Sequence, residues 1–107
     1  MADKWGALAQ VAPAATTLTL AYTVPAGKQS TVEAVICNRG AAATVRLSHA
    51  IAGAADAVAQ YLLYDYAIAT GESKVTARFT MNETDLLRVY ASTATVTFNI
   101  NGIEEDV

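Results

Sequence analysis

Alternation of larger apolar side chains with small or polar ones is the feature that most restricts what this chain can fold into. Residues 17–24, TLTLAYTV, carry larger apolar side chains at every second position: Leu18, Leu20, Tyr22 and Val24. A period of two is typical of a half-buried β-strand, because successive side chains of a strand point to opposite faces. We therefore expect one strand here, with these four side chains on its buried face.

A tight turn and a second strand follow directly. Pro25 has no backbone N–H to donate and Gly27 tolerates the backbone angles of a reversal, so this pair predicts a turn. Residues 30–38, STVEAVICN, carry apolar side chains on both faces, which predicts a strand in the centre of a sheet. The two segments together predict a β-hairpin.

The rest of the chain repeats this format of short alternating segments and small-residue turns. Five further strands are predicted, at residues 44–51, 61–69, 74–81, 86–92 and 95–102. Strands at this spacing are typical of all-β sandwiches and barrels. Between two of them, residues 52–60 are expected to form a loop or a single helical turn, because alanine favours a helix and Gly53 opposes it.

The most regular alternation lies in residues 74–81. Val75, Ala77, Phe79 and Met81 are expected to face the core, and the residues between them are expected to face solvent. If the other strands follow the same rule, most of them have one wet face, as in two antiparallel sheets packed together.

The length of 107 residues allows one domain with one core. A parallel sheet would need long helical crossovers for which the chain has no room. We expect an all-β fold, an antiparallel β-sandwich of about seven to eight strands with jelly-roll or immunoglobulin-like topology. Residues 1–15 are short on periodicity and are expected to form an extended N-terminal arm, with residues 16–107 as the sandwich.

Composition limits the classes of partner. The net charge is −3 and the basic residues are scattered, which argues against nucleic acid, because nucleic-acid binding needs concentrated lysine and arginine. No segment has the apolar length of a signal peptide or a membrane span, so we expect synthesis in the cytoplasm and no membrane contact. Much of the apolar fraction is alanine, so the core is expected to be thin and the chain to associate as a dimer or trimer or with a partner.

Residues that could carry chemistry are few. Cys37 is the only cysteine, and it is expected to be a small buried side chain on a strand. His49 falls on the apolar face of residues 44–51 and, without a second histidine, predicts a packed or interface residue rather than a metal ligand. Glu83 and Asp85 are the one close internal pair of carboxylates, in a predicted turn where acids are usually solvated. We expect no catalytic, cofactor or metal site, and hence no enzyme.

Six residues are predicted to contact a partner: Trp5, Lys28, Arg39, Tyr61, Tyr64 and Tyr66. Trp5 is the one large side chain of the arm, and tryptophan is enriched in interface hot spots; the alternative is that it packs on its own sandwich. Lys28 and Arg39 lie in the first two predicted turns. Alternation places Tyr64 and Tyr66 on one face and Tyr61 on the other, an arrangement that suits a protein interface, a core or a platform for sugars.

Three motifs are the most specific parts of a wider resemblance: T-V-P-A-G at residues 23–27, C-N-R-G at 37–40 and R-V-Y-A-S-T-A-T-V-T-F at 88–98. With the flanking strands, they resemble short β-sandwich proteins from the virions of tailed bacteriophages, over nearly the whole chain. The resemblance implies a structural role and carries over no catalytic residue, since these motifs are turns and strand ends. It implies a decoration or cement protein on the capsid surface, with the major capsid protein as partner.

Two alternatives remain open at this point. The same resemblance extends to proteins of the neck or tail, which are present in fewer copies. From a different class, the tyrosine-rich strand suits a carbohydrate-binding module for host attachment.

Overall fold

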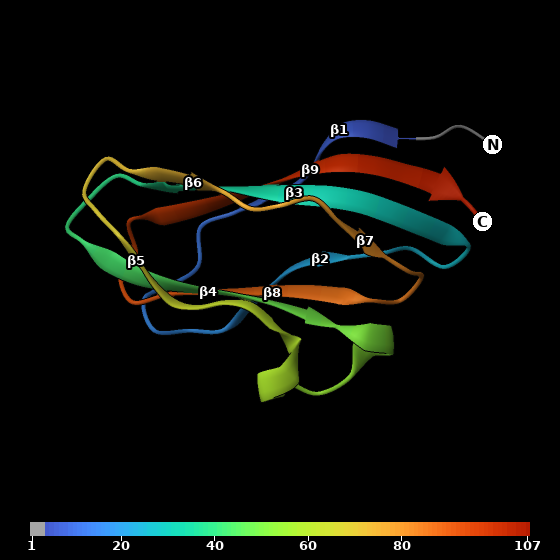
Figure 1. Cartoon of the computed structure of the whole chain (residues 1–107), viewed down its shortest axis with the longest axis horizontal. Helices are drawn as coiled ribbons and strands as arrows, with labels where there is room; N and C mark the ends of the chain where they lie inside the picture. The colour runs from blue at the N-terminus through green and yellow to red at the C-terminus, as the bar shows by residue number, and fades with distance from the viewer. Residues whose placement is uncertain (1–3) are drawn as a thin grey trace.

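The computed structural model describes residues 4–107, which form two antiparallel β-sheets packed face to face (Figure 1). Sheet A contains β1 (Lys4–Val11), β9 (Val96–Asp106), β3 (Lys28–Asn38), β6 (Ser73–Val75) and β7 (Phe79–Met81). Sheet B contains, in spatial order, β2 (Thr19–Thr23), β8 (Leu86–Ala91), β4 (Ala43–Ala50) and β5 (Tyr61–Ile68). The predicted antiparallel sandwich is confirmed.

The strand pairs are nested. β1 pairs with β9, β2 with β8, β3 with both β6 and β7, and β4 with β5. These pairs alternate between the two sheets, as expected when one long antiparallel ribbon is wrapped into a jelly roll. An immunoglobulin sandwich has a different strand order. The strand order therefore decides between the two topologies that the sequence left open.

The predicted hairpin at the start of the chain is wrong, although both of its strands exist. β2 belongs to sheet B and β3 to sheet A, so the chain crosses from one sheet to the other between them. The turn itself forms as expected, with the Lys28 amide donating to the Pro25 carbonyl over 3.1 Å. Both strands bury apolar side chains in the same core, but from opposite sides, and alternation alone does not say which strand a neighbour pairs with.

The expected N-terminal arm is not confirmed. Lys4–Val11 forms β1 and pairs with β9 along its length, from Lys4 opposite Glu104 to Val11 opposite Phe98, while the first three residues of the expected arm lie outside the described part. The sandwich therefore includes residues that the sequence assigned to the arm. Small residues in this segment blur the alternation that would have indicated a strand.

The core lies between four regular inner strands. β3 and β9 pair over eleven consecutive positions without a register shift, and β4 and β8 pair without one as well. Their inward side chains are fully buried, as the alternation predicted for Val32, Ala34, Ile36, Leu87, Val89, Ala91, Val96, Phe98 and Ile100. Gly102 allows β9 to approach β3 closely, because a Cβ there would lie 2.0 Å from the Thr31 carbonyl oxygen.

The edge strands are irregular in every case. β1, β2 and β5 each show a register shift against the strand beside them, and the last edge is split into β6 and β7. An extra residue in a strand moves every later side chain to the opposite face. Predictions that assumed unbroken alternation therefore fail at the edges.

Two of these failures concern the predicted inward faces. In and beside β2, Tyr22 and Val24 are buried as expected, but the strand shifts register between Leu20 and Tyr22, and Leu18 and Leu20 are exposed. The segment at residues 74–81 has one residue more than β3 between its two paired parts, β6 and β7. As a result, Val75 and Ala77 are exposed and Lys74 and Thr76 are half-buried, while Phe79 and Met81 keep the predicted orientation.

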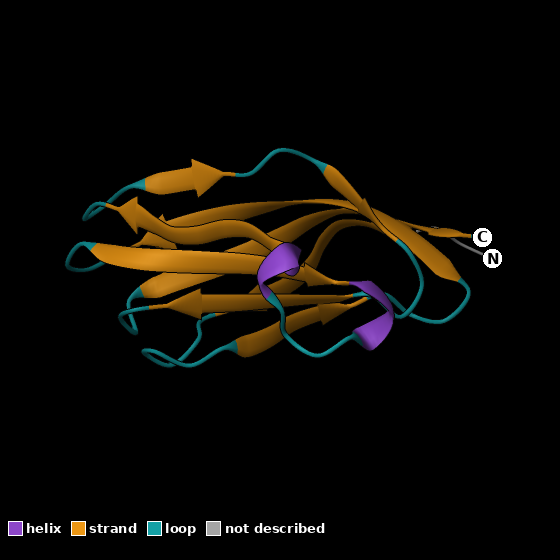
Figure 2. Cartoon of the chain, turned by 60° about the horizontal axis from the view of Figure 1, so that its bottom comes forward, coloured by secondary structure: helices purple, strands orange, loops and turns teal. Residues whose placement is uncertain are grey.

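The segment between β4 and β5 contains two short 3₁₀ turns, η1 (Ile51–Gly53) and η2 (Val58–Gln60), where a loop or a single turn was predicted. Both turns project on the side of sheet B that faces away from sheet A (Figure 2). Arg88 in β8 holds the segment in place, donating from Nη2 to the Ala54 carbonyl over 3.0 Å. We call residues 51–60 the β4–β5 connection.

Candidate interaction site

The structure does not bring the six predicted contact residues into one surface. Trp5 lies on sheet A, with a side chain that is 71% exposed. Lys28 begins β3 and its side chain is only 14% exposed, because its ammonium group pairs with Asp106 at 2.5 Å. Arg39 follows the far end of β3 and is exposed. Only the tyrosines share an element, β5.

A β-bulge in β5 decides where these tyrosines point. Asp65 has φ 52°, in the left-handed region, and the register against β4 shifts between Val45 and Leu47. Aspartate tolerates this conformation better than most residues. Tyr66 consequently packs against the core, whereas Tyr64 is 59% exposed. The prediction that Tyr64 and Tyr66 share a face is wrong, because it assumed unbroken alternation.

The bulge directs Tyr64 and Asp65 onto the side chain of Arg46 in β4. The Arg46 guanidinium lies 4.3 Å from the ring centre of Tyr64 and 4.5 Å from that of Tyr90 in β8. Its Nε donates to the Asp65 carboxylate over 2.6 Å, and this hydrogen bond raises the pKa of Arg46. Tyr61 meets Tyr64 edge-on, with ring centres 5.0 Å apart. We call Tyr90, Arg46, Tyr64 and Tyr61 the tyrosine row.

The tyrosine row runs across the outer face of sheet B over three strands. Each contact within it is weak, because solvent screens cation–π pairs at exposed sites. Together they hold long side chains in one arrangement before any partner arrives, which lowers the entropy lost on binding. Tyrosine and arginine are also the residue types that protein interfaces favour. The residue types of the row and the fixed arrangement of its side chains are typical of a binding surface.

Tyr61 links the row to the β4–β5 connection. Its hydroxyl donates to the Asp56 carboxylate over 3.0 Å. Burial raises the pKa of Tyr61, and the hydrogen bond to Asp56 raises it further. The connection therefore lies against the row, and it presents two strongly exposed aliphatic side chains, Ile51 and Val58.

Most of the exposed large apolar side chains within residues 4–107 belong to sheet B and its connections. Those of sheet B and its connections are Leu18, Leu20, Ile51, Val58, Leu62 and Tyr64, whereas sheet A and its ends contribute Trp5, Val75 and Val107. Large apolar groups that are exposed together mark interaction sites more often than isolated ones do. The outer side of sheet B is therefore the first candidate interaction surface.

His49 and Asp85 form a second polar feature, at one end of sheet B. Asp85 is 2% exposed and accepts hydrogen bonds from the His49 ring at 2.8 Å and from the amides of Ala52 and Asn82 at 2.8 and 2.9 Å. Burial by itself raises the pKa of Asp85, but these hydrogen bonds outweigh it and the pKa lies below its usual value. Sequence reasoning missed this role, since it treated the acids of the turn as solvated.

The donors around Asp85 define its role as a structural clasp. Because its oxygens face N–H groups, a cation would have to displace them. His49 is packed as predicted, with its ring 5.8 Å from that of Phe79. The pair fixes the start of the β4–β5 connection through Ala52 and the turn before β8 through Asn82.

A third polar cluster joins the two sheets through the interior. The Tyr22 hydroxyl in β2 lies between the Glu104 carboxylate of β9 and the Ser30 hydroxyl of β3, 2.7 Å from the latter. Burial raises the pKa of Tyr22, and the neighbouring Glu104 adds to the effect. Glu104 is thus buried at the edge of the core, beyond the last strand predicted from the sequence, residues 95–102. The cluster ties the sheets together and leaves no open site.

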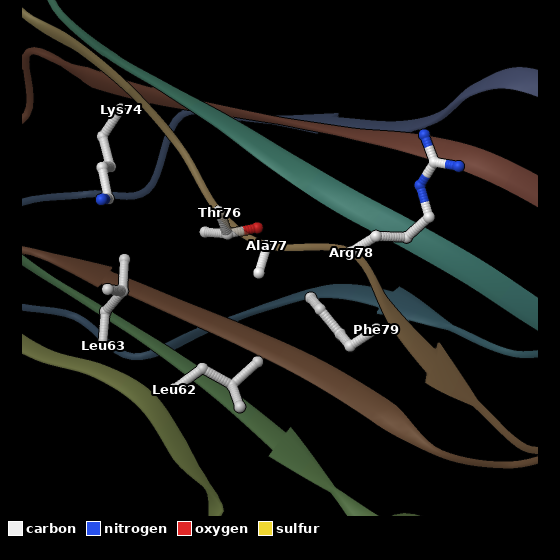
Figure 3. A pocket seen from close by; sticks show the side chains of 7 residues that line it. All are labelled: Leu62, Leu63, Lys74, Thr76, Ala77, Arg78 and Phe79. Atoms are coloured by element: carbon white, nitrogen blue, oxygen red, sulfur yellow. The ribbon is translucent and has the colours of Figure 1, made fainter.

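A groove opens where the edges of the two sheets face each other, between β5 and the β6–β7 segment (Figure 3). Its volume is about 270 Å³. Leu62 and Leu63 reach it from β5, and Ala77 and Phe79 from the opposite edge. Lys74 lies at one end and Thr76 beside Ala77, whereas the Arg78 side chain points away from the leucines (Figure 3).

The described residues provide no further chemical centre. Residues 4–107 contain no group of three or more histidine, cysteine or acidic side chains that could hold a metal ion. Cys37 is half-buried on β3 rather than fully buried. No helix in this part of the chain is long and apolar enough to cross a membrane.

Comparisons with known proteins find no relative of this chain. No protein-family model matches it, and neither does any curated protein or solved structure.

Proposed function

We propose that this chain is a non-enzymatic structural component of a tailed-phage virion. In this proposal it decorates the capsid and stabilises it by binding neighbouring subunits of the major capsid protein. The sequence motifs at residues 23–27, 37–40 and 88–98 support a virion protein. The jelly roll agrees with this, since the fold is common in viral structural proteins, although one fold hosts many functions.

The observation that carries the proposal is the ordered surface on the outer side of sheet B. The tyrosine row supplies rigid aromatic groups, and Ile51 and Val58 supply apolar area beside them. A protein that binds in many copies needs only a modest affinity at each contact, because a lattice of binding sites supplies avidity.

The irregular edges favour contact through faces rather than through strand addition. Bulges and charged side chains at sheet edges hinder pairing with a further strand. All the outer strands of this sandwich carry a register shift or a break. The main contact surface is therefore built from side chains, as the tyrosine row is.

Copy number per purified virion tests this proposal, measured by quantitative mass spectrometry against the major capsid protein. A copy number comparable to that of the capsid protein is expected for decoration of the lattice. A much smaller number would assign the chain to the neck or tail instead. Absence from purified virions would contradict the proposal.

A carbohydrate-binding module is the second candidate, and one observation favours it. The exposed Tyr64 ring lies beside the ion pair of Arg46 and Asp65, so an apolar face adjoins groups that bind hydroxyls. Signal on a glycan array that is lost in Tyr64→Ala would support this candidate. Silence across a broad array would remove it.

A further inference from the structure

We infer that the groove between β5 and the β6–β7 segment receives an apolar side chain with an adjacent carboxylate from a segment of the protein partner. This inference rests on the proposed function, in which the partner is a protein, and it names what that partner presents. Three features of the groove support it: its lining, its charge and the protection of its edges.

The lining suits one apolar side chain. Leu62, Leu63 and Phe79 point into the space between the two sheet edges (Figure 3). Pockets for drug-sized ligands span about 300–1,000 Å³. The volume of about 270 Å³ lies below that range, so a side chain fits better than a larger molecule.

The charge of the groove is complementary to a carboxylate. Its charged lining residues are Lys74 and Arg78, and no acidic side chain lines it. Of these two, Arg78 already pairs with Glu33, as Lys28 pairs with Asp106 and Arg46 with Asp65 elsewhere in the molecule. Within residues 4–107, no carboxylate forms an ion pair with Lys74.

Lys74 is also held in position. Its ammonium group lies 5.1 Å from the ring centre of Tyr66, and its side chain is directed towards β5 (Figure 3). A half-buried cation that faces an apolar cavity without an internal partner is complementary to an acid that arrives with an apolar group.

The bulges at both rims indicate how the segment binds. β5 carries the Asp65 bulge, and the facing edge is interrupted between β6 and β7. Neither rim offers a regular ladder for a new strand. The partner segment therefore inserts a side chain into the groove and does not extend a sheet.

Two matched dipeptides test the inference: N-acetyl-leucyl-glutamate amide and its neutral counterpart, N-acetyl-leucyl-glutamine amide. Titration into the full chain is followed by NMR at the methyl groups of Leu62 and Leu63. We expect the acidic peptide to shift these signals and to bind roughly two- to fivefold more tightly than the neutral one, the range of an exposed ion pair.

Two lysine variants identify the source of the preference. Lys74→Gln is expected to abolish the difference between the peptides. Lys4→Gln serves as the control, because Lys4 is exposed at the opposite edge of sheet A and should leave the preference intact. If Lys74→Gln does not fold, Ala77→Glu replaces it, because Ala77 lines the groove and both reporter leucines are kept; the added carboxylate should weaken binding of the acidic peptide more than that of the neutral one.

Several outcomes would overturn the inference. Equal binding of both peptides in the unchanged protein, or no shift at Leu62 and Leu63, would do so. Binding of octanoate without binding of either peptide would show a small-molecule site instead. These results are independent of copy number in virions. If the chain is abundant in virions but its groove binds neither peptide, only this inference is refuted. If the chain is absent from virions but binds the acidic peptide, only the proposed function is refuted.

Discussion

The outer faces of the two sheets differ in how they display their large side chains. On sheet B, Tyr90, Arg46, Tyr64 and Tyr61 contact one another in a row, and exposed aliphatic groups of the β4–β5 connection lie beside it. On sheet A, Trp5 is the one strongly exposed aromatic side chain. Both faces belong to antiparallel sheets of the same sandwich, so the difference between them lies in the placement of side chains.

Part of this difference depends on the bulge in β5. The bulge at Asp65 turns Tyr64 and Asp65 onto Arg46, and a regular β5 would separate these groups. A residue held in the left-handed region has a conformational cost, and such positions often occur at functional sites. The comparison therefore points to the outer side of sheet B as the contact side.

Removing the Asp85 clasp should have the largest effect on the outer side of sheet B, because Asp85 anchors the β4–β5 connection to this sheet. Asp85→Ala leaves the amides of Ala52 and Asn82 and the His49 ring without their acceptor. We expect a loss of about 3 kcal/mol in the free energy of unfolding, measured by urea denaturation. Glu105→Gln, at an exposed position, should stay within about 0.5 kcal/mol of the unchanged protein.

The same clasp should weaken in acid. The pKa of Asp85 is lower in the folded chain than its value of about 3.9 in an unfolded one. The ionised carboxylate therefore contributes stability above the unfolded pKa, and this contribution is lost as the pH falls through the folded pKa. The stability difference between the unchanged protein and Asp85→Asn should shrink as the pH is lowered from about 5 to about 2. A difference independent of pH in this window would contradict the assignment.

Matched alanine variants on the two faces should differ in how much they weaken binding to particles. Tyr64→Ala is expected to weaken binding to purified particles by about 2 kcal/mol, as for an interface hot spot. Trp5→Ala is expected to cost less than about 1 kcal/mol, because no second strongly exposed aromatic side chain lies on sheet A within residues 4–107. Sedimentation of labelled protein with particles measures both. A larger loss for Trp5→Ala would reverse the comparison.

The smallest expected effect is on the fixed arrangement of side chains within the tyrosine row. Arg46→Lys keeps the charge but removes the planar group between Tyr64 and Tyr90. We expect only a small loss in the free energy of unfolding, since the site is exposed and its cation–π contacts are weak. NMR signals of the two tyrosine rings should broaden or shift in this variant. Unchanged ring signals would show that Arg46 does not order the row.

How far the sequence predicts this molecule depends on the position of a strand in its sheet. Inner strands follow the period of two, so the burial of Ile36, Leu87 and Phe98 could be predicted directly. Edge strands contain bulges that depend on contacts across the sheet, and in residues 74–81, the most regular segment by sequence, Val75 and Ala77 lie on the opposite face for this reason.

The candidate site was predictable only in part. The density of tyrosine in β5 indicated a surface of interest, but Arg46 and Tyr90 join it from other strands and left no local signal. Asp85 was dismissed as a solvated turn residue, because its donors His49 and Ala52 are distant in sequence. Tertiary contacts of this kind do not appear in local patterns.

Oxidative footprinting of intact virions that carry this chain tests the central claim most directly. Labelling of Tyr64 and Trp5 would be compared between the free protein and the virion-bound protein by mass spectrometry. If the outer side of sheet B is the contact side, Tyr64 becomes several-fold less reactive in the virion while Trp5 changes little. Protection of Trp5 with full reactivity at Tyr64 would contradict this account.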